Sequence, residues 1–124
     1  MTTKRVLIAE DEATLAWVER FNLESEGYEV RVASEGVAAI EALASFEPDV
    51  LILDVMLPRL DGWSVLESIK EMPDERRPKV ILVSAAAGVA DRAQEESTAV
   101  DSFLAKPFDI EDLLDRVAEA FASA

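Results

Sequence analysis

The stretch Val50-Leu51-Ile52-Leu53-Asp54 decides the fold of this chain, because four consecutive apolar residues end abruptly on a carboxylate. A short continuous apolar run is typical of a central strand in a parallel sheet, where both faces of the strand are buried. An aspartate at the end of such a strand loses hydration on folding, which costs free energy unless another group compensates it. The stretch therefore predicts a buried strand with a charged partner at its end; a loop-entry turn closed by Asp54 is the alternative.

Three further apolar runs also end on polar side chains. The first precedes Glu10 and Asp11, the second ends on Ser84 and the third on Lys106. Because parallel strands present their carboxyl ends at one edge of a sheet, these side chains are expected to meet Asp54 in one crevice. Taken singly, each has a plainer interpretation as a solvated or capping residue. The runs are Val6-Leu7-Ile8-Ala9, Val80-Ile81-Leu82-Val83 and Phe103-Leu104-Ala105.

Strand-like runs alternate with helix-like segments over the whole chain, which predicts one α/β domain over residues 1–124. The expected architecture is a doubly wound five-stranded parallel sheet with five helices, a flavodoxin-like three-layer sandwich. The preferred strand order is 2-1-3-4-5, which places Glu10, Asp11 and Asp54 side by side at the switch point. The helices are expected over residues 12–26, around 37–44, over 62–72 and 89–98, and from Asp109 onward.

Helical spacing also predicts which residues of the first helix contact the sheet. The inward residues are expected to be Leu15, Val18 and either Phe21 or Asn22. Gly27 is a natural end for this helix, because glycine readily adopts the left-handed conformation that follows a helix. Trp17 and Trp63 are expected to cover the contact between helices and sheet.

The composition excludes several kinds of chemistry. The 124 residues contain no histidine and no cysteine, which removes imidazole bases, thiolate nucleophiles and the usual zinc or copper sites. Oxygen ligands for a hard cation such as magnesium or calcium remain. The net charge of −14 opposes direct nucleic-acid binding, and it serves either solubility or the attraction of cations. No apolar stretch is long enough for a membrane span or a signal peptide, which predicts a cytoplasmic protein.

Charge balance within the expected crevice favours Mg²⁺ and a phosphoryl group. Three carboxylates against the Lys106 ammonium leave about two negative charges, which one divalent cation neutralises. The chemistry deduced from these residue types is nucleophilic attack by Asp54 on phosphorus. In this scheme the metal and Lys106 hold the phosphoryl oxygens, and Ser84 donates a hydrogen bond.

These residues resemble the receiver domains of bacterial two-component response regulators, and the chain is similar in extent to stand-alone chemotaxis-type regulators. The densest match is Asp54-Val55-Met56-Leu57-Pro58-Arg59-Leu60-Asp61-Gly62, joined by residues 6–12 and by Lys106-Pro107-Phe108. The resemblance covers nearly the whole chain. It implies phosphorelay signal transduction, in which Asp54 accepts a phosphoryl group from a sensor histidine kinase or a histidine phosphotransfer protein.

The resemblance also implies a Mg²⁺ site. Asp11, Asp54 and the backbone carbonyl of Met56 would bind the ion directly, and Glu10 would act mainly through a bound water. Glu10 stands where an aspartate is more frequent in the family, which adds one methylene to this ligand.

The remaining implied roles concern the switch. Lys106 would contact the phosphoryl group, and the Lys106–Pro107 peptide bond would be cis. Ser84 would be the switch hydroxyl and Phe103 the switch aromatic. Phosphorylation would then change the surface of the fourth helix, fifth strand and fifth helix, which controls an unknown downstream protein. Such a domain is no enzyme in the usual sense, because it catalyses only its own phosphorylation and dephosphorylation.

The resemblance leaves the oligomeric state and the extent of the protein open. A monomer or a weak phosphorylation-dependent dimer is expected, with Arg92, Asp101 and Arg116 as candidate contacts. The chain ends shortly after the fifth predicted helix, which favours a protein that stands alone over an excised domain.

Three other classes of protein remain as alternatives. A magnesium-dependent phosphohydrolase would use the same nucleophile, but such enzymes commonly carry a second aspartate where Met56 stands. A pseudo-receiver would keep the fold as a binding module without phosphorylation. A flavodoxin-like nucleotide binder would need a glycine-rich phosphate loop after the first strand, and the sequence has none there.

Overall fold

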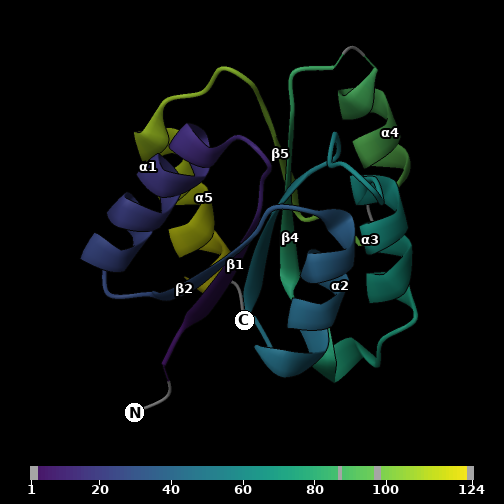
Figure 1. The fold of residues 1–124 in the computed structure, drawn as a ribbon, viewed down its shortest axis with the longest axis horizontal. Helices are drawn as coiled ribbons and strands as arrows, with labels where there is room; N and C mark the ends of the chain where they lie inside the picture. The colour runs from purple at the N-terminus through teal and green to yellow at the C-terminus, as the bar shows by residue number, and fades with distance from the viewer. Residues whose placement is uncertain (1–2, 87, 97–98, 123–124) are drawn as a thin grey trace.

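The computed structural model, which describes residues 3–86, 88–96 and 99–122, contains one five-stranded parallel sheet in the order β2-β1-β3-β4-β5 (Figure 1). Its register places Ile8 beside Ile52, and Ile52 beside Ile81, so that the three central strands share one buried layer. The predicted sheet and strand order are confirmed. The strands are β1 (Arg5–Ala9), β2 (Glu29–Ala33), β3 (Val50–Asp54), β4 (Lys79–Ser84) and β5 (Ser102–Ala105).

Helices cover both faces of the sheet. One face carries α1 and α5, and the other carries α2, α3 and α4 (Figure 1). This arrangement confirms the predicted three-layer sandwich, in which α1 to α4 each return the chain from the end of one parallel strand to the start of the next. The helices are α1 (Ala13–Ser25), α2 (Gly36–Ser45), α3 (Gly62–Lys70), α4 (Val89–Glu95) and α5 (Ile110–Ala122), with a single turn of 3₁₀ helix at Asp74–Arg76.

The central strands form the core. Every residue of β3 is buried, and its neighbours β1 and β4 are buried except at their first residues. Burial of one leucine or isoleucine side chain contributes roughly 1.5–3 kcal/mol, so these strands supply a large share of the hydrophobic stabilisation. Because the strands are rigid, the polar residues at their carboxyl ends are held at fixed positions.

Helix ends differ from the sequence-based expectations by a few residues. The third helix ends at Lys70 rather than at Met72, and the first and last begin one residue later than expected. The fourth ends at Glu95, and the expected continuation to residues 97–98 lies outside the described part of the chain. Gly27 follows α1 with a φ of 97°, which confirms its predicted role at the helix end.

The predicted inward face of α1 is wrong. The buried residues of this helix are Ala16, Glu19 and Leu23, whereas the side chain of Phe21 is 56% exposed and that of Trp17 is 63% exposed. The physical reason is that α1 packs against both the sheet and α5. The face buried by these two contacts contains Glu19, which a search for apolar residues at helical spacing assigns to the surface. Trp63, in contrast, is half-buried against the core as expected.

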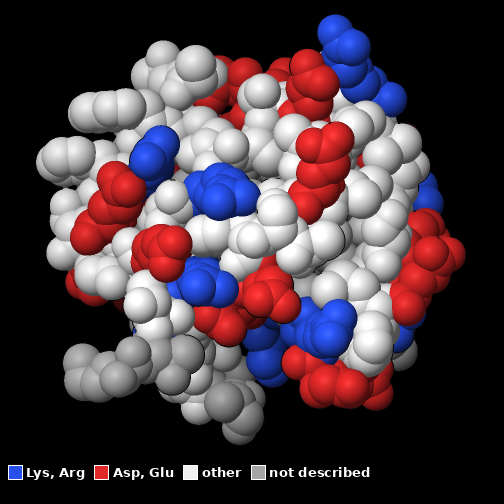
Figure 2. Space-filling model, turned by 60° about the horizontal axis from the view of Figure 1, so that its bottom comes forward, with Lys and Arg blue, Asp and Glu red and all other residues white. Residues whose placement is uncertain are grey.

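The surface shows mixed charge. On the face drawn in Figure 2, Lys and Arg side chains are interspersed with Asp and Glu and do not gather into one basic patch. Within the described residues, no helix is both long and apolar enough to cross a bilayer.

Candidate functional site

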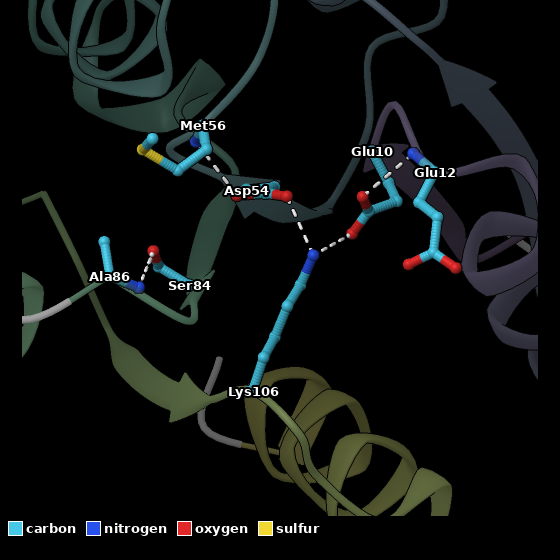
Figure 3. Close-up of polar contacts among 7 residues, drawn as sticks. All are labelled: Glu10, Glu12, Asp54, Met56, Ser84, Ala86 and Lys106. Atoms are coloured by element: carbon cyan, nitrogen blue, oxygen red, sulfur yellow. Dashed lines mark hydrogen bonds and ion pairs between the residues drawn. The ribbon is translucent and has the colours of Figure 1, made fainter.

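Lys106 lies between two buried carboxylates at the carboxyl edge of the sheet (Figure 3). Its Nζ donates to Glu10 Oε1 at 2.7 Å and to Asp54 Oδ2 at 2.8 Å. Glu10 follows β1, Asp54 ends β3 and Lys106 follows β5, so three elements far apart in the sequence supply one cluster. Glu10 and Asp54 are only 2% and 4% exposed, and therefore depend on Lys106 for compensation of their charge.

Asp11 completes an acidic cluster with Glu10 and Asp54. One carboxylate oxygen from each of these three residues lies within 4.8 Å of the other two. Asp11 is exposed while the other two are buried, so the cluster opens to solvent on one side. Three carboxylates at this spacing match the oxygen-rich donor set that Mg²⁺ and Ca²⁺ prefer.

Burial and hydrogen bonds change the ionisation of this cluster. Burial raises the pKa of Glu10, and the charge of Asp54 acts in the same direction, against the hydrogen bonds from Lys106 and from the Glu12 N–H. Burial lowers the pKa of Lys106, but the hydrogen bonds with Asp54 and Glu10 outweigh it, so the pKa is raised. Lys106 therefore stays charged, and Glu10 takes up a proton more readily than an ordinary glutamate.

Backbone groups after β3 fix the Asp54 carboxylate. The Met56 N–H donates to Asp54 Oδ1 at 2.9 Å, while the Met56 side chain itself is 64% exposed (Figure 3). The loop is tight because Gly62 begins α3 directly against the end of β3. A Cβ at Gly62 would lie 2.5 Å from Val55 Cα, and this close approach explains why glycine is needed there.

Ser84 and Phe103 lie where the sequence places them, on neighbouring strands. Ser84 ends β4 and is 1% exposed, and its Oγ accepts a hydrogen bond from the Ala86 N–H at 3.0 Å (Figure 3). Phe103 lies in β5 and is half-buried against the core on the α3 and α4 side of the sheet. The Lys106–Pro107 bond is cis, as the resemblance implies.

Sequence reasoning missed one titratable residue near the cluster. Glu19 of α1 is fully buried, and neither carboxyl oxygen has a hydrogen-bond partner in the described structure. The available signal was its position three residues after Ala16 and four before Leu23, on a helical stripe that is otherwise apolar.

The comparison with protein families decides what kind of domain this is. The model of the response regulator receiver domain matches residues 6–118. The chain belongs to the response regulator receiver family. Receivers are the phosphoacceptor domains of two-component signalling, so this chain is a signalling domain and no classical enzyme. The recognition made from the sequence motifs is thereby confirmed.

Among curated proteins, the receiver is similar to the DNA-binding dual master transcriptional regulator RpaA of Synechocystis sp. The two are 34% identical over 115 residues, which cover 91% of this chain and 47% of RpaA. The chain thus spans about half the length of the curated relatives that it matches.

Two solved structures support the fold. A CheY-like response regulator receiver domain protein from Methanospirillum hungatei JF-1 superposes with a TM-score of 0.87 at 25% identity, covering 98% of this chain and 96% of that one. The receiver domain of sensor histidine kinase PA1611 from Pseudomonas aeruginosa PAO1 gives 0.83 at 27% identity, covering 98% and 99%. The PA1611 receiver holds a magnesium ion in its active-site cleft.

Proposed function

We propose that Asp54 accepts a phosphoryl group from a phosphohistidine on a sensor histidine kinase or a histidine phosphotransfer protein. The observation that supports this most strongly is the position of the Lys106 ammonium between Asp54 and Glu10, at 2.8 and 2.7 Å. An ammonium that is already held beside Asp54 can stabilise the negative charge that develops on a phosphoryl group transferred to this residue. Residues 1–124 contain no histidine, so the donor histidine lies outside this receiver.

The transfer needs no general base. The ionised Asp54 carboxylate is already nucleophilic, and a new O–P bond forms as the P–N bond to the donor imidazole breaks. The electron pair of the broken bond stays on the imidazole nitrogen. Lys106 is free to follow the phosphoryl oxygens, and Ser84 can turn its hydroxyl from the Ala86 N–H to donate to one of them. Dephosphorylation, which we assign to the same site, is attack by water on the phosphorus; the O–P bond to Asp54 breaks, and the products are inorganic phosphate and the free carboxylate.

The acidic cluster fits a divalent cation. We assign Asp11, Asp54 and the Met56 backbone carbonyl as direct ligands of Mg²⁺, and Glu10 as a ligand that acts through water. When bound, Mg²⁺ neutralises charge on the phosphoryl oxygens and orients them. The cluster supports this assignment because its carboxylates exceed the charge of Lys106 by two.

Magnesium is expected to stabilise the receiver through Asp11. At ten times its dissociation constant, Mg²⁺ should add about 1.4 kcal/mol to the free energy of unfolding, which raises the melting temperature by roughly 5 °C. Asp11→Asn should lose most of this gain, because it removes an exposed ligand and leaves no buried charge without a partner. The check is thermal unfolding followed by circular dichroism with and without Mg²⁺. Asp74→Asn, which alters an acid far from the cluster, should respond like wild type; an equal gain in Asp11→Asn would contradict the ligand assignment.

Phosphorylation of Asp54 can be tested directly with a small-molecule phosphodonor. Incubation with acetyl phosphate and Mg²⁺ should add one phosphoryl group to the intact mass of the wild-type receiver. Asp54→Asn should stay unmodified, whereas Asp74→Asn should be modified like wild type. Mapping the group to another residue would refute the role of Asp54. Steady turnover of a phosphate ester would favour a phosphohydrolase, and a stable unmodified wild type would favour a pseudo-receiver.

The donor protein is proposed to bind beside α1. A groove of about 450 Å³ lies next to the cluster and is lined by Lys106 itself, by Leu15 and Val18 of α1, and by Pro107 and Phe108. Farther along α1, the exposed rings of Trp17 and Phe21 stack with centroids 5.4 Å apart. An exposed apolar surface that borders the phosphoacceptor suits a helix that carries a phosphohistidine.

The output surface is proposed to be α4, β5 and α5, with Ser84 and Phe103 as the switch. A movement of Ser84 would vacate space beside β5, which the half-buried Phe103 ring can fill. At rest α4 is joined to α3 by the Arg92 guanidinium, 4.1 Å above the Trp63 ring, and by the Lys70–Glu96 ion pair. Since only Val89 and Ala93 of α4 are buried, a small difference in free energy suffices to shift this helix.

We infer that residues 1–124 form one receiver unit that acts on a downstream protein as a monomer or a weak dimer. Intramolecular contacts engage all three candidate dimer residues: Arg92 with Trp63, Asp101 with the Val80 N–H, and Arg116 with the Phe103 carbonyl. These contacts favour the monomer.

Direct nucleic-acid binding by this receiver is not proposed, because its net charge is −14. DNA binding is a property of RpaA, which is about twice as long. The cytoplasmic location stays a prediction.

A further inference from the structure

Glu19 is a buried acid that none of these roles uses. Its side chain is 0% exposed and lies in α1 between Ala16 and Leu23, on the face that contacts the sheet. Neither of its carboxyl oxygens has a hydrogen-bond partner among the described residues. An unpaired carboxylate at such a place would lose its hydration without compensation, so Glu19 is held as a neutral carboxylic acid.

The Glu19 side chain is close enough to the acidic cluster for the charges of that cluster to act on it. The first residue of α1 is two positions after Asp11, at the carboxyl edge of the sheet, and helical side chains tilt toward the N-terminus of their helix. Glu19 is therefore buried near the acidic cluster, and its carboxyl oxygens make no hydrogen bond to any described residue.

Charged groups from several elements act on Glu19 through space. The pKa of Glu19 is raised from 4.5 to about 8; burial is the largest cause, the neighbouring carboxylates act in the same direction, and the ammonium of Lys106 opposes them. From α5, the neighbours in the same buried layer are apolar. The charged groups are Glu10 after β1, Lys106 after β5, Asp54 at the end of β3 and Glu12 before α1, and the apolar ones are Leu113 and Val117.

We propose that Glu19 is a proton-releasing group linked to the cation site, so that a divalent cation bound by Glu10, Asp11 and Asp54 drives the Glu19 proton into solvent. This inference rests on the proposed metal ligands. Without the cation, the three carboxylates and Lys106 carry a net charge of about −2, and ionisation of Glu19 would make it −3. With the cation the sum is about zero, so that the O–H bond of Glu19 can break and its proton pass to the buffer. Linkage is reciprocal, so alkaline pH must strengthen cation binding by the same factor.

Calorimetric titration with Mg²⁺ in two buffers of different ionisation enthalpy measures the protons released per ion. At pH 7.5, wild type should release roughly 0.3–0.8 proton per bound Mg²⁺, as expected for a group that is mostly neutral before binding and mostly ionised after it. Glu19→Gln should bind Mg²⁺ and release almost none. Glu24→Gln is the matched control, because it removes an exposed acid of the same helix that does not act on Glu19, and it should release as many protons as wild type.

A second measurement follows Glu19 itself. Carbon-13 NMR of the Glu19 carboxyl, assigned by its loss in Glu19→Gln, should show a titration midpoint that falls by one pH unit or more when Mg²⁺ is present. Equal proton release by wild type and Glu19→Gln, or an unmoved midpoint, would overturn the role of Glu19 and leave the metal site intact. Absence of Mg²⁺ binding in every variant would overturn the metal site and this linkage together.

Discussion

Replacement of Lys106 by methionine should lower the free energy of unfolding of the Mg²⁺-free receiver by about 3–5 kcal/mol, the usual loss when one partner of a buried ion pair is removed. Lys106 is the only described cation paired with Glu10 and Asp54, which are 2% and 4% exposed. Methionine keeps the length and apolar stem of the side chain, so the expected loss reports the missing charge and not a cavity.

Urea unfolding at several pH values measures this effect. The loss should be largest near pH 8 and should shrink as the pH falls, because burial raises the pKa of Glu10 and a protonated Glu10 leaves less uncompensated charge. Mg²⁺ should restore part of the stability. Lys70→Met is the matched control, since Lys70 pairs with Glu67 and Glu96 at the surface, and its effect should be far smaller. Similar losses in the two variants would contradict the importance of the buried pairs.

Replacement of Glu19 by leucine should stabilise the receiver, and increasingly so as the pH rises. The pKa of Glu19 is raised from 4.5 to about 8, so the folded state binds this proton more tightly than the unfolded chain does. Stability from this proton is complete below the unfolded pKa and is lost as the pH rises through the folded pKa. Between pH 4.5 and about pH 8, the free energy of unfolding of the wild type should therefore fall by up to about 1.4 kcal/mol per pH unit, and by about 3–5 kcal/mol in all.

The free energy of unfolding of wild type, Glu19→Leu and Glu19→Gln, measured from pH 5 to pH 9, tests this expectation. The difference between each variant and wild type should grow with pH and level off above pH 8 or so, where Glu19 is ionised. Glutamine removes the charge alone, whereas leucine also removes the unpaired polar atoms, so leucine should be the more stable of the two. A difference that stays constant with pH would show that Glu19 has an ordinary pKa.

The strand ends made the site predictable. The Val50–Asp54 stretch, and the similar runs before Glu10 and Lys106, end on polar groups, and parallel strands bring such ends to one edge. The structure joins these groups through Lys106 and places Asp11 beside them. Ser84 was harder to interpret, because a serine at a strand end is common, and only its burial and its bond to the Ala86 N–H show how its hydroxyl is held.

The faces of the helices were less predictable. In α1, the apolar pattern favoured Leu15 and Val18, but the sheet and α5 together bury Ala16, Glu19 and Leu23. A pattern counts apolar residues and treats a glutamate as a surface residue. Such a pattern cannot predict that a carboxyl group is buried in its neutral form. The charges of Glu10, Asp54 and Lys106 act on Glu19 only after distant strands have paired and brought them together.

By itself the sequence determined the layered fold and the polar residues at the strand ends, because continuous apolar runs and their termination are local properties of the chain. The strand order was the preferred order for a doubly wound fold, and the structure confirms it. Only the tertiary structure decided that Lys106 lies between Glu10 and Asp54, that Trp17 is exposed and that Glu19 is buried without a partner. Those properties depend on distances between residues as many as 96 positions apart, and on the water that packing removes from them.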